Sequence, residues 1–262
     1  MEMLLSLLAR YFFVASAKSL IVKPISAQDA NRIIRSLHYS GKIVPNSQLH
    51  FGVFLDGKCG GAMSFGPSTD KRRMLSLVSG TLWNEFVELN RMAFADWLPR
   101  NGESRCIAYA MRFIKKTYPQ LKWVVSFADG TQCGDGTIYR ASGFNLIGIK
   151  KNTSLLKMPN GEIVSRISLD TSPIHGRGGR FGSSIARENG ALPLIGFQLK
   201  YIYFLHPSAC SRLTVPILPF SEIEKCGAKM YLGKSSVVSA DSGTAGIQPA
   251  RDGANPITTL SS

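Results

Sequence analysis

The sequence predicts an α/β fold in which short apolar strands alternate with amphipathic helices. Three observations predict it. Two apolar runs flank Asp56-Gly57, which is a strong signal for a β-hairpin. Apolar residues recur at helical spacing after Glu103, with basic residues on the other faces. The run LKWVVSFAD then indicates a buried strand that ends at Asp129. A chain of 262 residues can bury a substantial core, and we expect one domain.

The N-terminal elements follow from local signals. The run LIVKP predicts a short strand, and Ser26 is the expected N-cap of a helix, with Asp29 three residues later. That helix is expected to stop near Gly41. The two strands of the hairpin follow, and the basic run KRRMLSLVSGTLWN predicts a connection. The next run, FVELNRMAFADWLP, predicts a strand whose end is marked by Pro99.

Later elements continue the alternation. The helix that begins at Glu103 should end before Pro119, GDGTIYRASGF predicts a short helix closed by Gly143, and FNLIGIKK predicts a strand. The predicted order to about residue 150 is β-α-β-β-β-α-β-α-β. IVSRISL (163–169) and KYIYFLHP (200–207) predict further strands, with the glycine- and arginine-rich loop HGRGGRFGSS between them.

The two ends of the chain are expected to differ from the domain between them. Residues 1–18 are apolar, but Arg10 interrupts a run that is already too short to span a bilayer, so we expect an extension and no membrane partner. Residues 234–262 have too little apolar content to order themselves. The expected domain covers residues 19–233, with a core at about 20–150 and an extension over 151–233.

The charge of the chain favours a polyanionic partner. The formal net charge is +14 and the sequence pI is about 9.8, and the basic excess lies before residue 235, within the expected domain. Such a balance commonly accompanies nucleic acid binding. The alternative is a basic protein whose cations are simply solvated. The candidate DNA-binding residues are Lys71, Arg72, Arg73, Arg177 and Arg180, with Arg212 as a further candidate.

The cysteines argue against a disulfide framework or a zinc site. The chain has five of them, widely spread and without a C-x-x-C pair. This usage is typical of a reducing cytoplasm, which is the expected compartment. The sequence also has no cluster of several acidic residues at metal-binding spacing, which disfavours hydrolysis of DNA as the activity.

A phosphate-binding loop is predicted at PRNGESR (99–105). There Asn101 could cap the following helix, Gly102 would let a phosphate approach the backbone, and the helix start adds partial positive charge. An ordinary capped helix is the alternative. The predicted element order resembles that of GNAT acyltransferases, and GTIYRASGF is similar to their final motif, although their usual glycine-rich pattern is not spelled out. This resemblance implies a GNAT-like mixed central sheet flanked by helices, with a β-containing C-terminal extension. It also implies acetyl-CoA or a related acyl-CoA bound by Arg100, Asn101, Gly102, Ser104, Arg105 and Ser126.

A second resemblance is more specific, because several blocks carry it in one order from about residue 20 to 220. LHYSG, FGVFLDG, ELNRMAFAD, NGESR, SFAD, GTIYRASGF and YIYFLHPSACSRLTVPILPF look like blocks of the Mom DNA-modification proteins of Mu-like phages. The resemblance implies a GNAT-like enzyme that converts adenine in phage DNA to an N6-carbamoylmethyl form. That modification blocks restriction enzymes of the host cell. The resemblance also implies acetyl-CoA and iron as cofactors, and the cytoplasm of a host cell as the compartment.

The resemblance assigns the candidate catalytic residues by position: His38, Tyr39, Arg91, Asp129 and Tyr139. The candidate iron ligands among them are His38, Tyr39 and Asp129, whose nitrogen and oxygen donors suit iron. From the residues alone, the alternative to a functional role is that His38 is a helix cap or a packed residue and that Tyr139 is a core residue. One departure concerns the loop after Asp129, where Asp135 stands in place of a histidine; its carboxylate, or the thiol of Cys133, could serve as a donor instead.

Asp129 is the acid at the end of a buried strand, where open α/β sheets usually bind ligands. Gly130, Gly134 and Gly136 would let the following backbone turn sharply beside a substrate; a plain turn with Asp129 as a cap is the alternative. We expect a DNA enzyme that extrudes adenine from the duplex into the site. Two rivals are an acyl-CoA N-acyltransferase acting on a protein or small amine, and a noncatalytic DNA-binding protein.

Overall fold

A computed structural model describes residues 16–130, 134–171, 181–194 and 196–227. Contacts divide the chain into two units, Met1–Tyr231 and Leu232–Ser262, and all described residues belong to the first. Most of the predicted N-terminal extension and the predicted C-terminal tail lie outside the described residues. So do Cys133, Arg177 and Arg180.

The central sheet is mixed and has seven strands in the order β1-β2-β3-β4-β5-β10-β6. Neighbouring strands are antiparallel except for the parallel pair β4–β5. The expected α/β class with a mixed sheet is confirmed. The strands are β1 (Ile21–Pro24), β2 (Leu49–Leu55), β3 (Lys58–Gly66), β4 (Phe86–Phe94), β5 (Trp123–Asp129), β6 (Asn145–Asn152) and β10 (Gly196–Phe204).

The strand β10 is supplied by the expected extension, yet it lies inside the central sheet. It pairs with β5 from Gln198↔Asp129 to Phe204↔Trp123 and with β6 on its other side. Its Leu199, Tyr201 and Ile202 are fully buried. Residues beyond 150 therefore complete the core of the domain.

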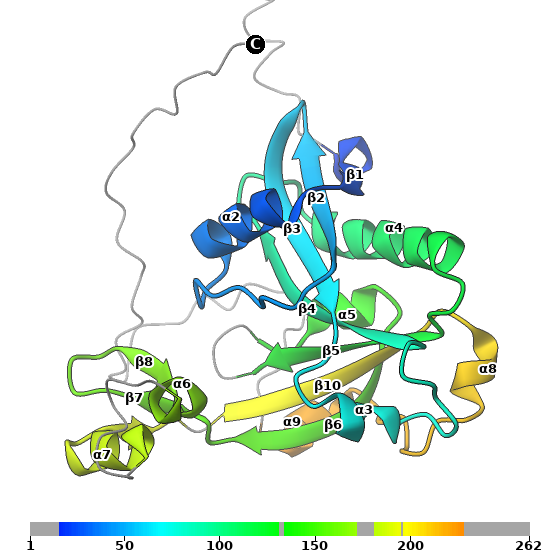
Figure 1. Cartoon of the computed structure of the whole chain (residues 1–262). Helices are drawn as coiled ribbons and strands as arrows, with labels where there is room; N and C mark the ends of the chain where they lie inside the picture. Colours follow the sequence, from blue (N-terminus) through cyan, green and yellow to red (C-terminus); the bar gives the residue numbers. More distant parts are fainter. Residues whose placement is uncertain (1–15, 131–133, 172–180, 195, 228–262) are drawn as a thin grey trace, which may run out of the picture. The chain divides into compact units, whose positions relative to one another are not determined.

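The helices cover both faces of the sheet. α2 and α4 lie on opposite faces of strands β2 to β4 (Figure 1). On the α4 face, Phe51 and Met63 pack in one cluster with α4; on the opposite face, Ala62 and Ala93 pack against α2. The elements are η1 (Ala17–Ser19), α2 (Ala27–Leu37), α3 (Lys71–Leu75), α4 (Gly102–Thr117), α5 (Thr137–Ala141), α8 (Pro207–Cys210) and α9 (Ser221–Lys225).

Several local predictions are confirmed. The Ser26 hydroxyl accepts a hydrogen bond from the Asp29 backbone N–H at 3.1 Å, which caps α2. Asp56 and Gly57 have φ of 49° and 79°, the two positive values that a type I′ hairpin turn requires. Gly143, with φ of 82°, follows α5 as expected.

Two local predictions are wrong. The basic run after Asp70 is not only a connection, because the Asp70 side chain accepts from the Arg73 backbone N–H and caps the short helix α3. Asn101 precedes α4 as expected but makes no side-chain cap bond. Its backbone is left-handed, with φ of 60°, so its amide cannot take the usual cap geometry.

Residues 153–194 contain a small unit beside the central sheet, built from β7 (Leu155–Lys157), β8 (Ile163–Ser165), α6 (Arg166–Asp170), α7 (Gly182–Glu188) and β9 (Leu192–Pro193). Its own core contains Leu156, Leu169 and Ala186. The predicted strand 163–169 is only half right, since the chain turns into α6 after Ser165. The turn is fixed because the Arg166 N–H donates to the Ser154 carbonyl at 2.7 Å.

The parallel strands β4 and β5 pair over only three positions, from Phe86↔Trp123 to Glu88↔Val125. Beyond them β4 continues to Phe94, and its register with β3 shifts between Ser64 and Phe65, which leaves Asn90 as the extra residue of a bulge. The two strands therefore separate where the sheet would otherwise be continuous. This separation provides the opening at which the site is built. Among the described residues, no helix has the length and apolarity needed to cross a membrane.

Candidate functional site

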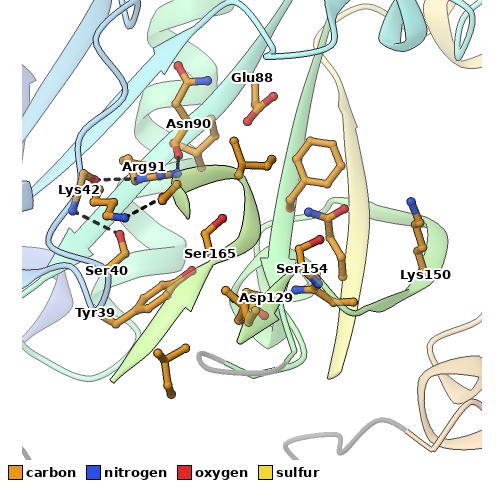
Figure 2. A pocket seen from close by; sticks show the side chains of 18 of the residues that line it. Tyr39, Ser40, Lys42, Glu88, Asn90, Arg91, Asp129, Lys150, Ser154 and Ser165 are labelled. Carbon is orange, nitrogen blue, oxygen red and sulfur yellow. Dashed lines mark hydrogen bonds between the residues drawn. The ribbon is translucent and has the colours of Figure 1, made fainter. Parts of the chain in front are cut away.

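A pocket of about 510 Å³ lies where β4 and β5 separate. Its lining includes Glu88 to Arg91 of β4, and Phe127 and Asp129 of β5. The loop after α2 contributes Tyr39, and the small unit of residues 153–194 closes the other side. Figure 2 shows Tyr39, Arg91 and Asp129 around this one cavity. Three of the predicted catalytic residues are thus brought together from distant parts of the chain.

The pocket opens on the face of the sheet opposite α4. Side chains alternate between faces along a strand, and Val125 belongs to the cluster that contains Met74 of α3, whereas Val124 and Ala128 pack with α4. Phe127 and Asp129 therefore lie on the side of α2 and α3. Ser126 points to the α4 side, where its hydroxyl donates to the Leu89 carbonyl at 3.4 Å across the gap. Of the predicted site residues, Asp129 therefore lies on the α2 and α3 side of the opening, and Ser126 lies on the α4 side.

His38 supports Tyr39. The two rings are 4.3 Å apart between centroids, with Tyr39 53% exposed. The Ser40 backbone N–H donates to His38 Nδ1 at 3.1 Å, so that nitrogen carries no proton and the neutral ring is protonated on Nε2. Burial, and then the Arg91 charge, lower the pKa of His38 to about 4. The imidazole is therefore neutral at pH 7 and holds the phenol ring at the edge of the pocket.

Arg91 holds the loop that carries Tyr39. Its Nε donates to the Lys42 carbonyl at 3.0 Å and its Nη1 donates to the Asn90 carbonyl at 2.8 Å. The Lys42 ammonium in turn donates to Ser168 Oγ of α6 at 3.0 Å. Dashed lines in Figure 2 mark the bonds of Arg91. The guanidinium therefore fixes one wall of the pocket, and a lysine links this wall to the opposite one.

Glu88 is a pocket acid that the sequence did not single out. Burial raises its pKa, an effect opposed by hydrogen bonds with Ser68 and Asn90 and by the charge of Arg91. Figure 2 shows its carboxyl at the end of the pocket beyond Asn90. The only sequence signal was an acidic residue inside an otherwise apolar strand. Such a carboxyl can accept a proton at a pH close to neutrality more readily than an ordinary one.

Asp129 ends β5, opposite Gln198 of β10, and both line the pocket. The next backbone N–H, of Gly130, donates to the Phe197 carbonyl at 2.7 Å. A Cβ at Gly130 would lie 2.9 Å from that same oxygen, so only glycine permits the approach. The glycine after the acid therefore anchors the strand end that presents the Asp129 carboxyl to the cavity.

Tyr139 lies outside the pocket lining, on the α4 side. It is 9% exposed and packs against Tyr201 and Phe144, with centroids 5.2 and 5.4 Å away. These surroundings favour the interpretation of Tyr139 as a core residue.

Asp135 is also buried; it accepts from the backbone N–H and hydroxyl of Thr137 at 2.9 and 2.6 Å, which fixes the start of α5. These bonds give Asp135 a structural task at the start of α5.

The predicted phosphate loop also lies on the α4 side. Gly102 is the first residue of α4 and is buried; a Cβ there would lie 2.8 Å from Leu20 Cδ1. The Ser104 hydroxyl donates to the Asn101 carbonyl at 3.2 Å, while Arg100 and Arg105 are exposed. The glycine therefore packs closely against Leu20, between η1 and β1, while Arg100 and Arg105 are left facing solvent.

The predicted iron ligands do not fit a metal centre. In the part of the chain that the structure describes, no three His, Cys, Asp or Glu side chains lie close enough to hold a metal ion. Nδ1 of His38 already accepts from Ser40, which leaves the Nε2–H as a donor, and a metal needs a free lone pair.

Cations extend from α3 to the pocket. The pKa of Lys200 on β10 is lowered by burial first, and then by Arg73 and Lys150, so these three cations are close enough to interact. Lys150 lines the pocket beside Lys151. Lys71 instead lies over the Trp83 ring at 4.4 Å, and Arg212 donates to the Ser79 carbonyl at 2.8 Å. Arg72 is exposed.

Comparison with known proteins shows the family of the chain. The Mom protein family matches the chain over residues 19–222. The chain is also 36% identical over 203 residues to the methylcarbamoylase Mom of Escherichia phage Mu, covering 77% of this chain and 82% of that protein. The chain belongs to the Mom protein family. This Mom-family chain is thus an enzyme, as the sequence predicted.

Solved structures similar to the Mom-family chain are acetyltransferases. One is the ribosomal-protein-S18-alanine N-acetyltransferase of Escherichia coli, with a TM-score of 0.42 and 10% identity, covering 71% of this chain and 94% of that one. Another is a Bacillus subtilis acetyltransferase in complex with CoA, with a TM-score of 0.43 and 10% identity, covering 71% and 98%.

Proposed function

We propose that this chain modifies adenine in double-stranded DNA to the N6-carbamoylmethyl form and thereby protects phage DNA from restriction in the cytoplasm of the host cell. The observation that carries the proposal is the match to the Mu methylcarbamoylase over 82% of that protein. The pocket supports it, because an exposed tyrosine ring and two carboxyl groups surround a cavity large enough for a base.

The pocket suits an extruded adenine. A base swung out of the duplex is normally read by stacking on an aromatic side chain and by polar contacts to its edge. Tyr39 offers the ring at the edge of the cavity, and Asp129 and Glu88 offer acceptors inside it. The exocyclic amine of adenine would then point toward the carboxyl groups. Its lone pair is delocalised into the ring, so a positioned base that takes the leaving proton would assist the attack.

In this arrangement Asp129 would accept the proton that N6 loses when it bonds to the methylene carbon of a carbamoylmethyl donor, while the leaving group of that donor departs from the same carbon with the bonding electron pair. Glu88, whose pKa is raised by burial, is the second acceptor along the same wall. Arg91 keeps the Tyr39 loop in place through the Lys42 carbonyl. Holding two reactants in the right geometry lowers the barrier of a bimolecular reaction by several kcal/mol, and by about 7 kcal/mol or more in favourable cases.

The donor would approach from the opposite face. The exposed Arg100 and Arg105 at the start of α4 could receive the phosphates of an acyl-CoA, because the N-terminus of a helix of this length carries partial positive charge, although Glu103 in the same turn opposes it. The donor end of that molecule would then approach the opening between β4 and β5 from the α4 side, where the buried Ser126 hydroxyl donates to the Leu89 carbonyl.

The cations that extend from α3 to the pocket offer a path for the phosphates. Lys200 is close enough to interact with both Arg73 and Lys150, and Lys150 lines the cavity. Each phosphate neutralised releases counterions and adds a salt-dependent contribution to affinity. These contacts would help to offset the few kcal/mol that base extrusion costs.

The test is mass spectrometry of nucleosides from bacterial cells that express the chain. We expect adenine carrying a carbamoylmethyl group, and plasmid DNA from these cells should resist restriction enzymes. Asp129→Asn should lower the modified fraction by about 100-fold or more. Asp56→Asn is the matched control, since Asp56 lies in the exposed hairpin turn and asparagine tolerates its φ of 49°.

Unmodified adenine in cells expressing the wild-type chain would contradict the proposal. Acylated amines on proteins or polyamines in those cells would identify the N-acyltransferase alternative instead. Full protection of the plasmid DNA isolated from cells that express Asp129→Asn would show that modification does not need Asp129 and would remove the assigned proton transfer from this carboxylate.

A further inference from the structure

Two large apolar side chains stand uncovered at the rim of the pocket. Ile167 in the first turn of α6 is 67% exposed, and Ile163 at the start of β8 is 43% exposed; both belong to the pocket lining. Fully burying an isoleucine stabilises a protein by about 1.5–3 kcal/mol, so leaving two of them uncovered at one place forgoes that gain. An apolar group beside a cavity is available to whatever enters the cavity.

The backbone that carries Ile167 is held firmly. The Arg166 N–H donates to the Ser154 carbonyl at 2.7 Å, and Asp170 at the end of the helix accepts from the Ser183 N–H at 2.9 Å. Leu169 anchors the same helix in the core of the small unit, with 3% exposure. The Lys42 ammonium reaches Ser168 from the opposite wall. Ile167 is therefore presented by a supported turn and projects at a defined place.

The charges around this apolar rim favour a polyanion as its occupant. Lys42, Lys150 and Lys151 line the pocket with the two isoleucines, and Lys150 continues the cations that extend from α3. Lys42 donates to Ser168, the neighbour of Ile167 in the chain, whereas Lys150 and Lys151 belong to β6 of the central sheet, as Glu88 belongs to β4 and Asp129 to β5. An apolar side chain beside cations is an arrangement by which proteins insert a side chain between the bases of a duplex while they bind its phosphates.

We propose that Ile167 is the wedge that enters duplex DNA and occupies the space left by the extruded adenine. The inference rests on the proposed function and adds to it the residue that keeps the base out of the stack. When adenine swings into the pocket, its partner base loses a stacking neighbour. The butyl side chain of Ile167 fills that gap, with Ile163 covering the side toward the cavity.

The experiment compares two duplexes that differ in how easily the base leaves the stack. The modified adenine is first located in DNA from cells that express the wild-type chain, and 2-aminopurine is placed at that position. In one duplex it is paired with thymine, and in the other it lies opposite an abasic site, where extrusion requires less energy. Fluorescence of 2-aminopurine rises as the base leaves the stack, and titration gives the affinity without any acyl donor.

Ile167→Ala should bind the paired duplex about tenfold more weakly than the wild-type chain, with less fluorescence at saturation, and should bind the abasic duplex within about twofold. Ile167→Leu should keep the wild-type behaviour, because leucine fills a similar volume. Ile21→Ala is the matched control: Ile21 is 60% exposed but lies on the edge strand β1. All three variants should melt at the wild-type temperature, since the replaced side chains are exposed.

Equal affinity of Ile167→Ala and the wild-type chain for the paired duplex would overturn the wedge. An equal loss on both duplexes would also overturn it, because a general contact to DNA would explain that result. If adenine in DNA from the expressing cells is unmodified, the proposed function fails and the wedge fails with it. If adenine is modified but Ile167→Ala behaves as the wild-type chain, the wedge alone fails.

Discussion

Acid should destabilise the fold through His38. In the folded chain, burial and the Arg91 charge lower the pKa of this imidazole from 6.5 to about 4. The unfolded chain therefore takes up this proton between pH 6.5 and about pH 4, while the folded chain does not. Stability attributable to His38 is present above pH 6.5 and is lost as the pH falls through this window.

The size of the effect follows from the two pKa values. A difference of one pKa unit corresponds to about 1.4 kcal/mol, so the gap between 6.5 and about 4 sets a limit of about 3.4 kcal/mol. The ring is only partly buried, and solvent screening reduces the contribution. We therefore expect a loss of about 1–2 kcal/mol in the free energy of unfolding between pH 7 and pH 4.

The assay is urea denaturation at several pH values for the wild-type chain and for His38→Asn. Asparagine keeps an acceptor for the Ser40 N–H but does not titrate, and every other group titrates in both proteins. The wild-type chain should therefore lose about 1–2 kcal/mol more than the variant between pH 7 and pH 4. Arg91→Met should raise the pKa of His38, because it removes the second cause of the shift.

The reasoning would be refuted if the unfolding free energies of the wild-type chain and of His38→Asn changed by the same amount between pH 7 and pH 4. An NMR titration of His38 with a midpoint near its ordinary value of 6.5 would also refute it. Either result would mean that water reaches the imidazole, and the ring could not then serve as a neutral support for Tyr39.

Three further predictions concern the core, the chemistry and the DNA path. Gly136→Ala should destabilise the fold by about 2–4 kcal/mol in urea denaturation, because φ is 73° and the new Cβ would lie 2.5 Å from the Tyr201 ring. Wild-type activity should fall on the acid side at a pH above the ordinary glutamate value, because burial raises the pKa of Glu88, and Glu88→Gln should move that limb of the pH–rate profile to lower pH. Lys150→Gln should weaken DNA binding and reduce the salt slope of the binding constant by about 1.

Two of these have a matched control, and the third has an outcome that would contradict it. Gly134→Ala carries the strain of a positive φ, 98°, without a neighbour within 4 Å, so a loss as large as that of Gly136→Ala would argue against the contact with Tyr201. An unchanged acid limb in Glu88→Gln would assign that limb to another group. Lys115→Gln, at the end of α4, should leave the salt slope unchanged, and an equal effect of the two lysines would remove the proposed path.

Sequence reasoning succeeded where a structure depends on neighbours along the chain. The Ser26 cap, the Asp56-Gly57 turn and the apolar face of α4 each follow from residues within a few positions of one another, and all three are confirmed. The same reasoning was wrong about the side-chain cap at Asn101, because the backbone of Asn101 adopts a left-handed conformation that local composition does not dictate.

The parts of the site that depend on tertiary structure could not be predicted in the same way. Glu88 owes its raised pKa to burial beside the bulge of β4, and no motif marks it. Tyr139 was assigned by resemblance, yet its ring belongs to the core because β10 brings Tyr201 against it. Ile167 was read as part of a strand, and only the helix that starts after Ser165 turns it toward the rim of the pocket.

The central position of β10 has a consequence for synthesis of the protein. Until residues 196–204 have left the ribosome, β5 and β6 cannot find the partner that separates them, and each presents unpaired backbone groups. The nascent chain must therefore hold a long stretch with an incomplete sheet, a state that favours association with other chains. A fragment ending near residue 152 would retain Tyr39, Arg91 and Asp129 in its sequence but should accumulate as aggregates.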